Sequence, residues 1–220
     1  MDLLIYRDLA IMVFAAIGFI SGASEYLRPH RPLYASMIVL GTGCIALGRA
    51  YTFMRVLTGL PVNGVFHAGI LGTVGAFAFF FSSNYGQIDS LVDDGGDDFI
   101  KYRASALLGV AAAAAIYIWI LYSPVPRAEK ISDGIAAAAI ALASYFHLKH
   151  IFIPDVDYGV VSCLRGFNVL ALIYGMLCML EMAVSAYGYR LPLAVICVFQ
   201  CIVAVLLVPV MKKGVHEWSR

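Results

Sequence analysis

Long apolar stretches, separated by short segments that contain charge, proline or glycine, run along the whole chain. A transmembrane helix needs about 20 mostly apolar residues to cross about 30 Å of hydrocarbon. Stretches of this kind occur at residues 8–27, 33–54, 64–83, 104–123, 134–153, 164–186 and 191–211. Alanine-rich runs favour helix over strand, and the alternating ten-residue segments of a membrane β-barrel do not occur. The pattern predicts an all-α protein, a single transmembrane domain built as a bundle of seven helices.

The composition agrees with this pattern. Of the 220 residues, 62% are hydrophobic and 13% are charged, whereas a soluble domain is about half apolar and about a quarter charged. Such a chain cannot cover a surface that faces water. We therefore expect a multi-pass integral protein of the plasma or inner membrane, with the lipid bilayer as its main partner. A net charge of +1 gives no basic surface for nucleic acid.

The distribution of lysine and arginine between the loops predicts the orientation, because cytoplasmic loops carry the excess. The side that holds the N-terminus has five of these residues: Arg7, Arg55, Arg127, Lys130 and Arg190. The opposite side has nine: Arg28, Arg31, Lys101, Arg103, Lys149, Arg165, Lys212, Lys213 and Arg220. The N-terminus is accordingly expected outside and the C-terminus inside.

A spacing of 62 residues relates two parts of the chain. It places Ser82 on Ser144, Asp93 on Asp155 and Arg103 on Arg165. Repeats are common in membrane folds, so this spacing suggests repeated helix hairpins followed by a seventh helix. Chance similarity between apolar spans with polar ends is the alternative.

Glycines at helical spacing mark where helices approach closely. The first span contains a GxxxG motif from Gly18 to Gly22, and Gly48 and Gly72 lie in the second and third spans. Packing within one chain and a homo-oligomer interface both explain these glycines, and the sequence does not separate them.

Polar and ionisable side chains inside the predicted spans are the candidates for function, because they are costly in a bilayer. With a helical rise of about 1.5 Å per residue, Arg49, His67 and Glu181 fall at one depth in the outer half of the bundle. Gln200 lies closer to the middle. Aromatic residues at outer or middle depth complete the predicted ligand-binding set: Tyr51, Trp119 and Tyr174.

Two interpretations of this outer set remain open. Arg49 can bind a carboxylate of a ligand, or pair with Glu181 while the site is empty. Alternatively, the two form a purely structural ion pair, or each reaches independently to the membrane interface.

A second polar level is expected toward the cytoplasm, where Asn84, His147, His150 and Asn168 fall at similar depth. His147 and His150 share a helix face and precede two aspartates, yet this spacing fits many interfaces, and we predict no metal site. The acidic run 93–98 lacks the ligand spacing of an EF-hand and is expected to be a solvated loop.

Recognisable catalytic and cofactor motifs are absent from the sequence: it has no HExxH, no GxSxG, no P-loop and no Rossmann glycines. We therefore predict no bound cofactor and no catalytic residues. The leading hypothesis is a receptor-like or sensor module that binds a small molecule in the outer pocket. A small secondary transporter is the alternative. An intramembrane enzyme acting on lipid, which would use His147, His150 and the nearby Asp155 and Asp157, is a third possibility.

Overall fold

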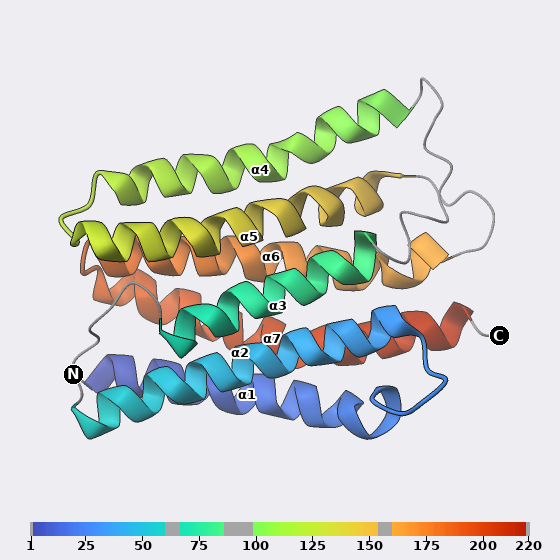
Figure 1. Ribbon diagram of the computed structural model, residues 1–220, viewed down its shortest axis with the longest axis horizontal. Helices are drawn as coiled ribbons and strands as arrows, with labels where there is room; N and C mark the ends of the chain where they lie inside the picture. The colour runs from blue at the N-terminus through green and yellow to red at the C-terminus, as the bar shows by residue number, and fades with distance from the viewer. Residues whose placement is uncertain (1, 60–66, 86–98, 154–159, 219–220) are drawn as a thin grey trace.

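The computed structural model describes residues 2–59, 67–85, 99–153 and 160–218, and these residues form helices and their flanking turns. The helices are α1 (Asp2–Tyr26), α2 (Leu33–Thr58), α3 (Ala68–Tyr85), α4 (Phe99–Leu121), α5 (Arg127–Phe152), α6 (Val160–Ala186) and α7 (Arg190–Trp218). Consecutive helices run in opposite directions (Figure 1). The starts of α1, α3, α5 and α7 therefore share one end of the bundle, which we call the N-terminal end.

Six of the described helices, all except α3, are long and apolar enough to cross a membrane. The shorter α3 has 18 residues and ends in the polar sequence Ser82-Ser83-Asn84-Tyr85. This all-helical architecture fits a multi-pass helical membrane bundle. The helices follow the predicted spans, with two differences that matter for the site: α1 begins at Asp2 and not at residue 8, and α5 begins at Arg127 and not at residue 134.

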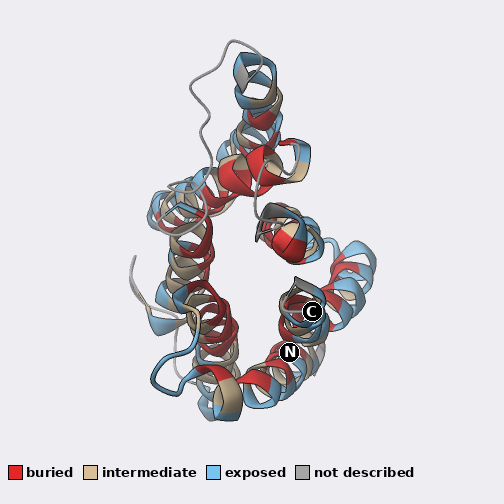
Figure 2. Cartoon of the chain, turned by 90° about the vertical axis from the view of Figure 1, so that its right-hand side faces the viewer, coloured by how far each residue is buried: buried red, intermediate tan, exposed pale blue. Residues whose placement is uncertain are grey.

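The helices pack as a ring with one helix outside it. Each ring helix contacts the next in the order α1, α2, α3, α5, α6, α7, and α7 contacts α1 to close the ring. Helix α4 packs outside the ring against α5 and α6. Figures 1 and 2 show α4 at the periphery of the molecule. The polar side chains described below project between the ring helices.

Polarity is distributed opposite to that of a soluble protein. Large apolar side chains such as Leu108 of α4 and Phe199 of α7 are exposed, whereas Asn84, Asn168 and Gln200 are completely buried. In a bilayer the exposed apolar side chains face lipid, and polar groups find their partners only inside the bundle.

Close helix approaches occur at the glycines that the sequence highlights. A Cβ atom added to Gly72 of α3 would lie 2.5 Å from the Cα atom of Gly48 in α2. Gly18 packs against the Ala204 carbonyl of α7, and Gly22 lies between α2 and α7 side chains. These glycines therefore pack helices within one chain, as one of the two interpretations expects.

Candidate functional site

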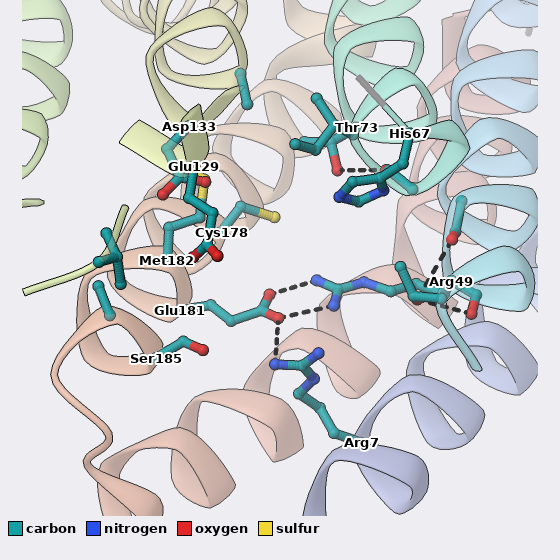
Figure 3. A pocket seen from close by; sticks show the side chains of 17 residues that line it. Arg7, Arg49, His67, Thr73, Glu129, Asp133, Cys178, Glu181, Met182 and Ser185 are labelled. Carbon is teal, nitrogen blue, oxygen red and sulfur yellow. Dashed lines mark hydrogen bonds and ion pairs between the residues drawn. The ribbon is translucent and has the colours of Figure 1, made fainter. Parts of the chain in front are cut away.

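A polar cavity of about 250 Å³ lies at the N-terminal end of the bundle. Residues of α1, α2, α3, α5 and α6 line it, together with His67 directly before α3. Figure 3 shows Arg49 from α2 facing Glu181 from α6, with Arg7 of α1 beside them. Three of the predicted ligand-binding residues, Arg49, His67 and Glu181, thus line one cavity.

Two arginines and two acids form a closed cluster at this cavity. Arg49 donates from Nη1 to Oε1 of Glu181 over 2.7 Å, and its Nη2 makes a second contact with Oε2. Arg7 Nη1 lies 3.2 Å from Glu181 Oε1. Asp8 accepts two hydrogen bonds of 3.0 Å from Arg7 and one of 3.0 Å from Arg49. We call these four residues the Arg–acid cluster.

The Arg–acid cluster balances its own charge, with two positive and two negative side chains. Asp8 is 1% exposed and Glu181 is 6% exposed, so an unpaired charge at either position would be strongly destabilising. The ion pair between Arg49 and Glu181 that the sequence left open as an alternative is therefore present. Both partners nevertheless keep a surface toward the cavity.

Gln200 of α7 holds Glu181 from the side that faces away from the cavity. Its Nε2 donates to Oε2 of Glu181 over 2.7 Å and contacts the Cys178 sulfur at 3.6 Å. Gln200 is completely buried and does not line the cavity. Its role in the structure is to hold the Glu181 carboxylate in place.

Two further carboxylates line the cavity from α5. Glu129 and Asp133 are four residues apart, so they lie on one face of that helix. Figure 3 shows both on the α5 side of the pocket, away from the arginines. Among the described residues, neither side chain forms a hydrogen bond or an ion pair.

His67 forms part of the wall on the α2 and α3 side. Its ring stacks on Tyr51 with 6.1 Å between the ring centroids, and Arg55 lies over the other ring at 5.6 Å. Partial burial, and in second place the charge of Arg55, lower the pKa of His67 and so favour the neutral imidazole. Its Nδ1 atom is buried and has no partner among the described residues.

The remaining two predicted residues take different places. Tyr174 is buried below the cavity, where it stacks on Phe77 at 6.3 Å and borders a small adjoining hollow next to Arg49. Trp119 of α4 instead stacks on Tyr187 at 5.5 Å and is not among the residues that line the cavity.

Sequence reasoning missed Arg7, Asp8, Glu129 and Asp133. Arg7 counted only toward topology, and Asp8 only as the edge of the first span. The two acids were placed in a loop because the fifth span was predicted to begin at 134. Pro124 and Pro126 before an acidic first turn, followed by the spacing from Glu129 to Asp133, were the available signal for an earlier helix start.

The predicted inner polar level exists as a buried network. Asn84 Nδ2 lies 2.9 Å from His147 Nδ1 and donates to Asn168 Oδ1 over 2.9 Å, while Asn84 Oδ1 lies 2.9 Å from His150 Nδ1. The described residues contain no group of three His, Cys, Asp or Glu side chains that could hold a metal. The acidic residues 93–98, and the aspartates at 155 and 157, lie outside the described residues.

An aromatic layer separates the inner network from the cavity. Phe77, Phe80, Phe167 and Tyr174 are buried and in ring contact, with centroid distances of 5.5 to 6.3 Å. His147 of the inner network contacts this layer through Phe167 at 5.8 Å. The two polar levels therefore lie on opposite sides of a packed apolar layer.

Comparisons with protein-family models, with curated proteins and with solved structures found no match to this chain. The function is therefore inferred from the site itself.

Proposed function

We propose that this protein is a seven-helix membrane module of the sensor or receptor type, and that it binds a small molecule in the cavity beside the Arg–acid cluster. In this proposal all seven described helices span the bilayer, with the N-terminus outside and the C-terminus inside. Three repeated hairpins and a seventh helix remain part of the same proposal.

One observation carries the proposal: a cavity at one end of the bundle has an ionic wall that the protein holds in place. Ligand sites typically combine a pocket with a few polar groups in defined positions. Here Arg49 and Glu181 are oriented by Arg7, Asp8 and Gln200, so the wall exists before a ligand arrives. Such order reduces the entropy cost of binding.

The aromatic layer below the cavity favours a sensor over a protein with a continuous polar path through the bundle. Phe77, Phe80 and Phe167 are each at most 1% exposed, and together with Tyr174 they lie between the two polar levels. A ligand bound above this layer would change the packing of α3 and α6, which both contribute to it. A helix displacement of this kind is a common way to transmit a signal.

A small secondary transporter is the second candidate, and the inner network supports it. His147 Nε2 and Asn168 Nδ2 are buried without a hydrogen-bond partner among the described residues. A substrate that passed the aromatic layer would meet these groups. Uptake of the identified ligand into proteoliposomes separates the candidates, because a sensor binds the ligand without saturable flux.

The proposal is tested by closing the cavity. Purified protein is screened for thermal stabilisation by a library of small amines, amino acids, carboxylates and sugars. Each compound that stabilises the wild type is tested again on Ser185→Trp, at the cavity wall, and on Tyr189→Trp, exposed at the same end outside the cavity. We expect stabilisation of the wild type and of Tyr189→Trp, and loss of it in Ser185→Trp.

Two results would contradict the proposal. In one, no compound stabilises the wild type. In the other, every compound that does so stabilises Ser185→Trp equally, which would place binding outside the cavity.

A further inference from the structure

The charge balance of the cavity restricts the chemistry of its ligand, and this inference rests on the proposed function. The two arginines of the cavity are already neutralised within the Arg–acid cluster. Arg49 contacts both Glu181 and Asp8, and Arg7 does the same. An anionic ligand would have to displace one of these acids and leave a buried carboxylate without its partner, which is costly.

The α5 wall has the opposite property. Glu129 and Asp133 face the cavity, and no hydrogen bond or ion pair to either is present among the described residues. Glu181 lines the same cavity, so Asp133 shares it with two other carboxylates, Glu129 and Glu181, which have the same sign. A cation between the two α5 carboxylates relieves this repulsion, whereas an anion increases it.

The space and the geometry favour an organic cation over a metal ion. The cavity of about 250 Å³ is larger than a bare ion needs and close to the lower limit of small-molecule pockets, about 300 Å³. No three potential ligating side chains within the described residues are close enough to hold a metal. Ile70, Ala136 and Met182 also line the cavity and offer apolar contacts to a carbon skeleton.

We propose that the ligand of this cavity is a small organic cation, an amine or an ammonium compound, whose charge lies between Glu129 and Asp133. Its apolar part contacts Met182 and Ala136. At its other end lie His67 and the hydroxyl groups of Thr52 and Thr73, which donate to backbone carbonyls and can accept a hydrogen bond from a polar group.

The selectivity of the cavity for charge is measured with thiol reagents of opposite sign. Met182→Cys places a thiol in the cavity wall, and Tyr189→Cys places one outside the cavity at the same end of the bundle. Both are made in a Cys178→Ser background, because Cys178 also lines the cavity. Purified protein reacts with the cationic 2-(trimethylammonium)ethyl methanethiosulfonate or the anionic 2-sulfonatoethyl methanethiosulfonate. The rate for each reagent is divided by the rate at which the same reagent modifies free 2-mercaptoethanol, which corrects for its intrinsic reactivity.

We expect the cationic reagent to modify Met182→Cys at least about tenfold faster than the anionic reagent, because a cleft of one sign concentrates counterions. At Tyr189→Cys the two normalised rates should be about equal. Adding Glu129→Gln and Asp133→Asn should reduce the ratio at Met182→Cys to that control value. If the double variant fails to fold, Glu129→Gln and Asp133→Asn are tested singly. Each should then reduce the ratio of cationic to anionic rate in part.

The outcomes distinguish this inference from the proposed function. If both reagents modify Met182→Cys and the anionic one is as fast or faster, the organic cation is wrong and the ligand pocket stands. If neither modifies Met182→Cys while both modify Tyr189→Cys, the cavity is closed to small molecules, and both proposals fail.

Discussion

Arg49 of α2 and Glu181 of α6 are 132 positions apart in sequence, yet Nη1 of the arginine donates to Oε1 of the acid over 2.7 Å. The side chain of Arg49 is 15% exposed and the side chain of Glu181 is 8% exposed. Buried pairs of this kind give little net stability, but removing one partner is expensive. The pair thus couples two helices of the ring at the wall of the cavity.

A double-mutant cycle tests this coupling. Arg49→Met and Glu181→Leu should each lower the free energy of unfolding by about 3–5 kcal/mol, because each leaves a buried charge without its main partner. The double variant should lose less than the sum of the two, since Arg7 and Asp8 still balance each other. Unfolding in mixed micelles of increasing SDS fraction measures all four proteins.

Arg55→Met is the matched control for that cycle, because Arg55 contacts the Tyr51 hydroxyl at 3.3 Å and forms no ion pair with any of the described residues. Its effect should stay within about 1 kcal/mol. Strict additivity of Arg49→Met and Glu181→Leu would show that the pair does not couple α2 to α6.

The second prediction concerns the close packing of α2 against α3 at Gly48 and Gly72. In Gly72→Ala the new Cβ would meet backbone atoms of Gly48 and Cys44 at 2.5 to 2.9 Å, so a helix must move, and a loss of about 1–3 kcal/mol is expected. Gly75→Ala on the same helix meets only the Cys44 side chain, at 3.3 Å or more. That control should be neutral or slightly stabilised, because alanine is the better helix former. Equal thermal stability of the two variants would contradict the close packing.

The inner network makes a third prediction. Asn84→Leu removes the amide that links His147, His150 and Asn168, so buried polar atoms lose their partner and stability should fall by about 1–3 kcal/mol. Ser82→Ala, near the end of the same helix, removes only a hydrogen bond to the preceding turn and should change stability little. Thermal unfolding followed by size-exclusion fluorescence compares them, and an unchanged Asn84→Leu would argue against the network.

The orientation is a fourth prediction, and it follows from the excess of basic residues on one side. A membrane-impermeant maleimide should label Tyr189→Cys in intact cells, and label Lys213→Cys only after permeabilisation. Both positions are exposed and lie at opposite ends of the bundle. Background labelling of the wild-type cysteines is subtracted. The reverse pattern would place the cavity on the cytoplasmic side.

Much of the fold could be predicted because each helix depends on a local property. The length of an apolar run decides whether a helix can cross hydrocarbon, and helix direction alternates with each span. Depth also follows from counting residues, which is why Arg49, His67 and Glu181 were placed at one level. Trp119 has a similar depth but lies on α4, outside the ring, so depth alone does not bring a residue to the cavity.

The sequence by itself determined a membrane bundle of helices, their approximate bounds and a short set of polar residues that need a reason to be inside. Only the tertiary structure decided which of these residues meet. It joined Arg7 and Asp8 to the Arg49–Glu181 pair, and it turned Glu129 and Asp133 toward the same cavity. The physical reason is that contacts between helices depend on their order around the ring and their rotation. Both are set by packing among distant residues, such as Gly48 with Gly72, and not by the apolar run that forms each helix.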